Sequence, residues 1–351
     1  MSSSPPRVLF VPVSGPSGMG EFARARSVAD ALRQRWPQVE THFVLHRDAP
    51  YARGLDHPVT LLPASPTLCT TEVLAVMREF RPDVVFFDNA GRTGLLRAAA
   101  RAGARVVYVS SRRRQRYKAF RLRWMRLLDE HWISYPALLA GELGAFERLK
   151  LRLLGRPAIR FLDAVLAPAD AAAADRLLGA GAAPDVVIVP GGGSRFHDVS
   201  ITPAHFAGWA TALAARGHSV VFVAGPAFDV PLPESPRLRV LRGVGGAALM
   251  AILQRTQLVL VNGGDTLLQA LALGRPCVTV PIAGDQAARI ARCAALGMVV
   301  SPAIDQVEPA CAALLADAPA RQALVARVQA IGLRDAMPGI VATLGKQLGL
   351  A

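Results

Sequence analysis

The sequence predicts an α/β protein built from two doubly wound, Rossmann-like domains that face a common cleft. Two observations lead to this fold class. Short apolar runs alternate along the whole chain with stretches of helical period, which is the pattern of parallel β–α units. The length of 351 residues is too great for one compact core and fits two domains of about 150 residues each.

The apolar runs divide the chain into two similar halves. In the first half the expected strands are residues 7–14, 41–46, 59–62, 83–88, 105–110 and 132–135. In the second half they are residues 185–190, 219–224, 238–241, 257–261, 276–281 and 298–301. We therefore expect an N-terminal domain over 1–165, a C-terminal domain over 184–335 and a helix over 336–351 that can cross back to the first domain.

Composition excludes several other classes of protein. A chain that is 52% hydrophobic and 19% charged is neither disordered nor fibrous. No apolar stretch approaches the 18 residues of a membrane span, and the first residues lack the pattern of a signal peptide. The four cysteines lie far apart without metal-ligand spacing, which suits a reducing compartment. We expect a cytoplasmic protein, with peripheral attachment to the inner face of the cytoplasmic membrane as an option.

Most of the net charge of +14 lies in the first half, where residues 1–165 carry 26 Lys and Arg against 14 Asp and Glu. The segment 112–126 alone has eight basic residues and no acidic one, interleaved with Tyr117, Phe120 and Trp124. This pattern favours an interfacial helix on an anionic membrane or another anionic partner. An ordinary solvated helix is the alternative, and the lack of any nucleic-acid-binding signature disfavours nucleic acid. The expected contact residues are Arg112, Arg113, Arg114, Arg116, Lys118, Arg121, Arg123 and Trp124.

A glycine-rich turn at 14–21 follows the first strand and opens a helix over 22–35. Its glycines are spaced GxxGxG, unlike the dinucleotide fingerprint GxGxxG, so we expect a substrate loop and no NAD site. Gly18, Gly20 and Arg24 are candidates for binding the acceptor or a phosphate. Glu21 is the candidate general base. A capped turn with a helix-stabilising acid is the alternative.

Two further glycine turns follow strands of the second half. A Gly pair at Asn262–Thr266 directs backbone N–H groups toward an anion, as a pyrophosphate site requires. A triple glycine follows the first strand of the second half and lets the backbone approach a donor phosphate closely, at Gly191, Gly192 and Gly193. Ser194 and Arg195 come next in this candidate donor site, and His197 is a weaker candidate for it. Asp285 and Gln286, at the end of another strand, supply groups for sugar hydroxyls. Each turn taken singly is also compatible with a purely structural role.

Residues 262–299 resemble the donor-binding region of GT-B glycosyltransferases, including UDP-glycosyltransferases and the N-acetylglucosaminyltransferase that forms lipid II. The similar elements are Asn262-Gly263-Gly264, the helix Leu268–Pro276 with its LxxLxxGxP pattern, and the PxxxDQ loop at Pro281–Gln286. The resemblance implies that Gly263, Gly264, Asp265 and Thr266 hold the donor diphosphate, and that Asp285 and Gln286 bind the sugar. It also implies ribose binding at Gln269, where relatives carry Glu, and base binding around Gly243 and Met250.

In the N-terminal half, Gly18–Arg24 and Val28–Leu32 are similar to the opening motif of GT-B relatives such as the UDP-sugar hydrolase of pseudaminic acid synthesis. Residues 86–89 and 106–111 also resemble strands in the middle of that group's first domain. Glu21 stands where that group has a His taken as the catalytic base. A glutamate can perform the same proton abstraction, and a changed reaction is the alternative. We take Glu21 as the general base and Asp88 as the residue that orients or assists it.

These observations together predict a glycosyltransferase that moves a sugar from a nucleotide diphosphate, with UDP favoured, to an acceptor hydroxyl. Inversion at the anomeric carbon is expected, and so is independence of a metal, because there is no DxD motif. The nucleotide sugar is a co-substrate, no separate cofactor is expected, and a lipid-linked acceptor is one option. A nucleotide-sugar hydrolase, a 2-epimerase and a silent nucleotide-sugar-binding protein on the same fold are the alternatives.

Overall fold

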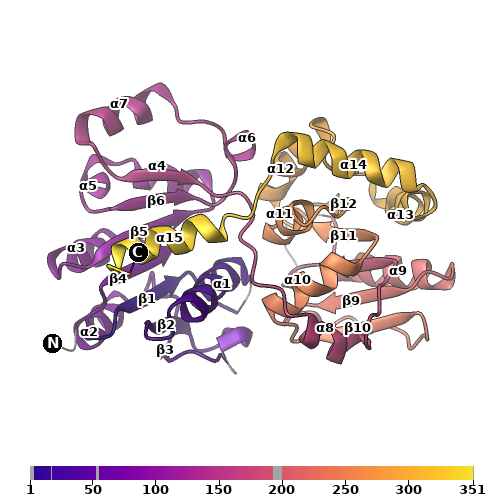
Figure 1. The fold of residues 1–351 in the computed structure, drawn as a ribbon, viewed down its shortest axis with the longest axis horizontal. Coiled ribbons are helices and arrows are strands. Elements are labelled where there is room, and N and C mark those ends of the chain that lie inside the picture. The colour runs from indigo at the N-terminus through magenta and orange to yellow at the C-terminus, as the bar shows by residue number, and fades with distance from the viewer. Residues whose placement is uncertain (1–3, 17, 53–54, 193–199, 351) are drawn as a thin grey trace. The chain divides into compact units, whose positions relative to one another are not determined.

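The computed structural model describes residues 4–16, 18–52, 55–192 and 200–350. The chain divides into two compact units: unit 1 comprises Met1–Asp163 and Ala336–Ala351, and unit 2 comprises Ala164–Asp335. Each unit is a parallel sheet with helices packed on both faces (Figure 1). This arrangement confirms the predicted α/β class with two Rossmann-like domains.

Unit 1 contains a seven-stranded parallel sheet in the order β3-β2-β1-β4-β5-β6-β7. The strands in that order are Val59–Leu62, Glu40–His46, Arg7–Pro12, Val84–Asp88, Arg105–Ser110, Glu130–Ile133 and Ala158–Phe161. The order reverses between β1 and β4, so the loops that follow these two strands diverge to opposite faces of the sheet. A ligand of such a sheet binds in the crevice at this switch point.

Successive strand residues of unit 1 alternate between two cores. On one face, Phe10 and Phe43 stack at 4.9 Å beneath helix α1 (Gly20–Arg35), which also contacts helix α15 (Met337–Gln347). On the other face, Leu9 and Val85 pack in one cluster with residues of α2 (Thr70–Phe80), α3 (Thr93–Arg101), α4 (Arg113–Ala119) and α5 (Leu122–Met125). Three short elements of unit 1 complete the fold. Helices α6 (Ala137–Ala140) and α7 (Ala145–Leu154) lie between β6 and β7 in the sequence, and the 3-10 helix η1 (Pro50–Ala52) follows β2.

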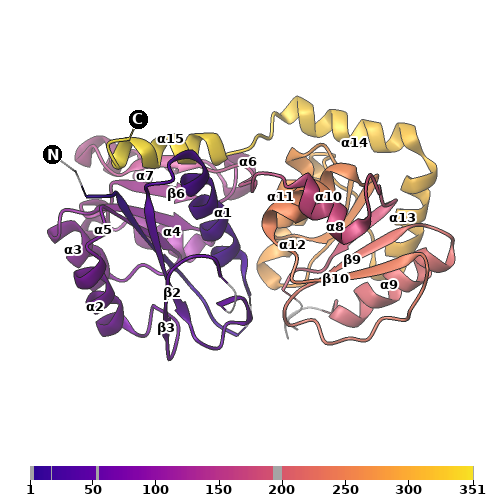
Figure 2. The same ribbon diagram turned by 60° about the horizontal axis from the view of Figure 1, so that its bottom comes forward.

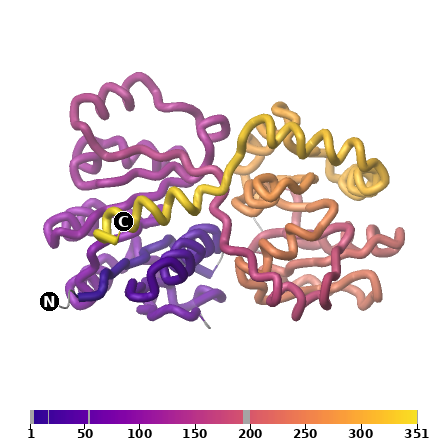
Figure 3. Tube along the Cα trace, in the orientation of Figure 1, coloured from indigo at the N-terminus to yellow at the C-terminus, as the bar shows by residue number. Residues whose placement is uncertain are grey.

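Figure 3 shows the yellow C-terminal segment that ends in α15.

Unit 2 contains a five-stranded parallel sheet in the order β10-β9-β8-β11-β12. The strands in that order are Leu238–Arg242, Val220–Ala224, Val186–Val189, Leu258–Asn262 and Cys277–Val280. Its switch point lies between β8 and β11. The two glycine turns that the sequence marks therefore follow the two strands at which the strand order reverses.

Helices on one face of the unit 2 sheet are α9 (Pro203–Ala215) and α13 (Val307–Ala316), whose Phe206 and Val307 share a core cluster with the strands. The remaining elements are α8 (Ala171–Leu178), α10 (Gly246–Arg255), α11 (Asp265–Ala272), α12 (Gly284–Ala295), η2 (Ile304–Gln306) and α14 (Ala318–Ile331), which Figure 2 shows from a second direction. Of the helices within the described residues, none has both the length and the apolar character needed to cross a bilayer.

One expected strand is wrong, and one strand of the structure was not expected. Residues 298–301 form only an isolated bridge between Val278 and Val300. Met298 and Val299 are buried, so this apolar run reflects packing in the core and not strand pairing. Strand β7 was not expected, since its residues alternate between exposed and half-buried and Arg160 interrupts the apolar run. Both cases lie at the edge of a sheet, beside β6 or β12. At an edge an apolar residue can be buried without pairing in a strand, and a strand can pair without being buried.

Candidate active site

Glu21 lies in the first turn of α1, at the carboxyl end of the unit 1 sheet beside its switch point. Asn89, directly after β4, donates from Nδ2 to Glu21 Oε1 at 2.9 Å and to Ser111 Oγ at 3.1 Å. The Ser111 backbone N–H in turn donates to Asn89 Oδ1 at 3.0 Å. The loop after β4 thus holds the carboxylate through Asn89, and the segment after β5 holds Asn89 through Ser111. Sequence reasoning singled out Glu21 but gave Asn89 and Ser111 no role in the site.

Asn89 adopts a left-handed backbone conformation with φ of +54°. Asn is the residue type other than glycine that enters this region most readily, because its short polar side chain can form local hydrogen bonds. The turn after β4 directs the side-chain amide toward Ser111 and Glu21. An Asp-Asn pair ending a buried strand is a sequence signal that could have identified this position.

Asp88 and Arg24 form a buried ion pair, contrary to the roles expected for them. Arg24 Nε donates to Asp88 Oδ2 at 2.7 Å, and a second guanidinium nitrogen donates to Oδ1 at 3.1 Å. Asp88 is fully buried and Arg24 is 5% exposed. A carboxylate neutralised in this way is unsuited to assist a base, and the guanidinium is unavailable to an acceptor phosphate. The pair instead connects α1 to the end of β4, and Arg24 also donates to Ser111 Oγ at 2.9 Å.

The turn before α1 is open at the glycines that the sequence marks. Gly18 has φ of +77°, and a side chain at Gly18 or Gly20 would meet no atom within 4 Å. Tyr51 lies beside this turn and accepts a hydrogen bond from the Gly15 N–H at 3.4 Å. Burial raises the pKa of Tyr51 to about 12, and the Glu21 carboxylate adds to this effect. Tyr51, which sequence reasoning missed, is therefore held as a neutral phenol even at alkaline pH.

The Gly-Gly turn of unit 2 follows β11 and is held by two side chains. Gln286 Oε1 accepts from the Gly263 N–H at 3.2 Å and from the Ile282 N–H at 2.9 Å. Asn262 Oδ1 accepts from the Gly264 N–H at 2.7 Å and from Gln286 Nε2 at 3.3 Å. The two backbone N–H groups assigned to a diphosphate therefore already donate to neutral oxygens of the protein.

Gln286 differs from its expected role as a ligand of sugar hydroxyls. Both polar atoms of its amide connect the turns after β11 and β12, so they serve to order the site. Asp285 is exposed and pairs with Arg289 one helical turn later, at 3.3 Å. Arg289 also donates to the Gly263 carbonyl, which places a cation at this turn that the sequence reasoning missed. The i, i+4 spacing of an acid and a base on α12 is a signal for such a pair.

The turn after β8 approaches the same side chain. Gly191 has φ of +88°, and a Cβ there would collide with Asn262 Nδ2, so this position needs glycine. Gly192 accepts a hydrogen bond at its carbonyl from the Ala227 N–H at 2.9 Å. The predicted site residues Gly193, Ser194, Arg195 and His197 lie outside the described residues.

The other residues predicted to bind the donor differ in how accessible they are to a ligand. Gln269 Nε2 donates to the Val165 carbonyl at 2.8 Å, so its amide secures the start of unit 2. Met250 is 1% exposed and belongs to the interior, which excludes direct contact with a nucleotide base. Gly243 is exposed with φ of +64°, and Asp265 and Thr266 are half-buried in the first turn of α11.

The basic segment 112–126 forms two short helices, α4 and α5, and not one continuous helix. Trp124 is 3% exposed and packs edge-on against Tyr108, and Arg116 is 9% exposed. Neither can contact a partner, because the stripe that they share with Phe120 faces the core. The other expected contact residues are exposed or half-buried, namely Arg112, Arg113, Arg114, Lys118, Arg121 and Arg123.

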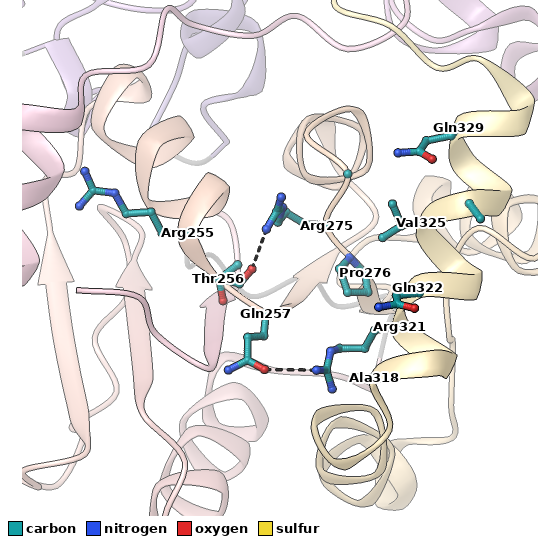
Figure 4. A pocket seen from close by; sticks show the side chains of 12 residues that line it. Arg255, Thr256, Gln257, Arg275, Pro276, Ala318, Arg321, Gln322, Val325 and Gln329 are labelled. Carbon is teal, nitrogen blue, oxygen red and sulfur yellow. Dashed lines mark hydrogen bonds between the residues drawn. The ribbon is translucent and has the colours of Figure 1, made fainter. Parts of the chain in front are cut away.

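A pocket of about 480 Å³ in unit 2 lies at the opposite edge of the sheet, before β11 and β12. Figure 4 shows Arg275 bonded to the Thr256 carbonyl and Arg321 bonded to Gln257. Because these guanidinium groups bind the protein's own oxygens, we do not place the active site here. Within the described ranges, no group of three His, Cys, Asp or Glu side chains is arranged to hold a metal ion.

No protein-family model matches this chain, and no curated protein matches its sequence. Solved structures do match it over nearly its full length. UGT2 of Phytolacca americana, complexed with UDP-2-fluoroglucose and pterostilbene, is 13% identical, with a TM-score of 0.64 over 98% of this chain and 100% of that one. The spinosyn rhamnosyltransferase SpnG is 18% identical, with a TM-score of 0.63 over 97% and 99% of the respective chains.

MurG of Acinetobacter baumannii is 14% identical, with a TM-score of 0.57 over 97% of this chain and 100% of that one. Identities of this size show the fold. The chain has the GT-B fold of these glycosyltransferases, which confirms the fold that the resemblance of residues 262–299 implied.

Proposed function

We propose that this protein is a glycosyltransferase that moves a sugar from a UDP-linked donor to an acceptor hydroxyl with inversion, unit 2 binding the donor and unit 1 the acceptor. The observation that carries the proposal is the half-buried Glu21 carboxylate, held by Asn89 at the switch point of the unit 1 sheet. The GT-B structures to which the chain is similar include one solved with UDP-2-fluoroglucose, which favours a UDP-linked donor.

Glu21 acts in this proposal as the general base. Its carboxylate accepts the proton of the acceptor hydroxyl while that oxygen forms a bond to the anomeric carbon. The bond from the anomeric carbon to the donor phosphate breaks, and its electron pair leaves with the diphosphate. Asn89 donates to Oε1, so the carboxylate is oriented before the acceptor arrives.

The Gly263 and Gly264 amides suit the departing diphosphate. Both now donate to side-chain oxygens of Gln286 and Asn262, which shows that these N–H groups point toward acceptors. Phosphate oxygens are charged and therefore stronger acceptors than these neutral amide oxygens. We propose that the donor takes the place of one or both oxygens, and that no metal is needed because the chain lacks a DxD motif.

The test is a panel of nucleotide sugars with simple hydroxyl acceptors, comparing the wild-type protein with Glu21→Gln. Loss of the base should lower kcat by about 10²–10⁴-fold and leave donor affinity nearly unchanged. Glu72→Gln is the matched control, since Glu72 is an exposed acid in the first turn of α2. EDTA should leave the rate unchanged.

Other outcomes separate the alternatives. Rapid turnover without an acceptor would favour a hydrolase or epimerase. Donor binding without turnover in any mixture would favour a silent binding protein. Equal rates for the wild type and Glu21→Gln would remove Glu21 from the mechanism.

A further inference from the structure

Helix α7 presents an uncovered apolar stripe. None of its ten residues is buried, although five are Phe or Leu. Phe146 is 80% exposed, Leu149 51% and Leu153 75%. Their spacing of i, i+3 and i+7 places the three side chains on one side of the helix. Exposed apolar residues grouped in this way mark a surface that binds something apolar.

Polar side chains beside this stripe attach α7 to α4. Glu147 accepts two hydrogen bonds from the Arg116 guanidinium, at 2.7 and 3.1 Å, and both side chains are about nine-tenths buried. Lys150 Nζ donates to the Phe120 carbonyl at 3.2 Å. The helix therefore has a fixed orientation, and Figure 1 shows it at the outer side of α4. The exposed stripe cannot turn inward without breaking a buried ion pair.

Helices α4 and α5 carry further exposed apolar residues and a strong positive charge. Among the described residues, seven large apolar side chains are exposed, and five of them are Tyr117, Leu122, Phe146, Leu149 and Leu153. A hollow of about 550 Å³ on α4 is lined by Arg113, Arg114, Tyr117, Lys118 and Arg121. Burial lowers the pKa of Lys118, and the charges of Arg114, Arg92 and Arg121 lower it further. Such a concentration of cations favours an anionic partner.

We propose that α7 is an interfacial helix that inserts Phe146, Leu149 and Leu153 into an anionic lipid bilayer, while the arginines of α4 bind lipid phosphates. A bilayer fits both observations, because it offers an apolar phase directly beneath a negatively charged surface. This assignment differs from the sequence-based expectation, which placed the inserted aromatic residues on the 112–126 segment. It does not depend on sugar transfer.

The test is co-sedimentation of the full chain with vesicles of phosphatidylcholine alone, or of phosphatidylcholine with phosphatidylglycerol. The wild-type protein should bind the mixed vesicles and release them as salt is raised. The Phe146→Ser/Leu153→Ser double variant should bind at least about tenfold more weakly, because two inserted side chains are lost. Leu68→Ser is the matched control, since Leu68 is 71% exposed and lies before α2.

A charge variant tests the second half of the proposal. Arg113→Gln/Arg114→Gln should weaken binding to the mixed vesicles by about 30-fold, because two basic residues are lost and each one near an anionic surface raises the affinity about fivefold. The substituted side chains are exposed, so thermal unfolding of every variant should match that of the wild type.

Three results would overturn the proposal. One is failure of the wild-type protein to bind mixed vesicles. Another is equal binding by the Phe146→Ser/Leu153→Ser variant. The third is a lipid-free dimer that the same variant dissociates, which would assign the stripe to a second copy of the chain. Vesicle binding needs no turnover, so these results are independent of whether Glu21→Gln is inactive.

Discussion

At the scale of single residues, His131 shows how burial changes the chemistry of a side chain that sequence alone leaves ambiguous. It lies in β6, fully buried, with Nε2 at 2.9 Å from Ser110 Oγ and its ring 5.3 Å from that of Phe120. Burial lowers its pKa to about 3, and the positive charge of Arg116 contributes. His131 is therefore a neutral core residue and no candidate for catalysis.

This shift predicts a pH-dependent stability. Between pH 6.5 and about 3 the unfolded chain binds a proton at His131 that the folded chain does not, so stability falls as the pH falls through this window. The contribution is at most about 1.4 kcal/mol per pH unit. Urea unfolding of His131→Gln at pH 7 and pH 4.5 should show a smaller loss than the wild type. Parallel losses in the two proteins would contradict this prediction.

At the scale of elements, the Arg24–Asp88 pair joins α1 to β4 beneath the candidate base. Replacing one partner leaves the other charge buried and unpaired, which typically costs about 3–5 kcal/mol. Arg24→Met should therefore lower the free energy of unfolding by about this amount in urea. Arg26→Met is the control, because Arg26 forms a half-exposed pair with Asp30 at 3.7 Å and should contribute less than about 0.5 kcal/mol. Similar effects of the two substitutions would contradict the assignment.

Elements were predictable where burial and period coincide. Strands β3 and β5 have the bounds that their apolar runs predict. Residues 106–110 of β5 are all buried, and β3 ends on the buried Leu62. The surroundings of the 112–126 segment were harder to predict, because its helical stripe of Arg116, Phe120 and Trp124 is compatible with either a lipid surface or a protein core. Pattern alone cannot distinguish these, because both environments exclude water.

At the scale of the whole molecule, the chain builds unit 1 from both of its ends. Ile340 and Leu344 of α15 are fully buried, and Trp36 at the end of α1 packs against Gly345. The last residues therefore belong to the core of the first unit, although unit 2 precedes them in the chain.

We predict that Leu344→Ala destabilises unit 1 selectively, by about 2–5 kcal/mol. Hydrogen exchange should show reduced protection in β1 and β4, with β8 and β11 unchanged. Leu213→Ala, in the core of unit 2, should give the reverse pattern. Equal loss of protection in both units after either substitution would show that they unfold together.

Strand and helix periods and glycine positions are local properties, so the two-domain α/β architecture and the position of the glycine turns could be predicted from the amino-acid sequence. The sequence also marked Glu21. Three features became visible only in the folded chain: Asn89 holds Glu21 from 68 residues away, Asp88 and Arg24 neutralise each other, and Gln286 orders the glycine turn. Hydrogen-bond partners and burial depend on which distant segments meet, and no local pattern contains that information.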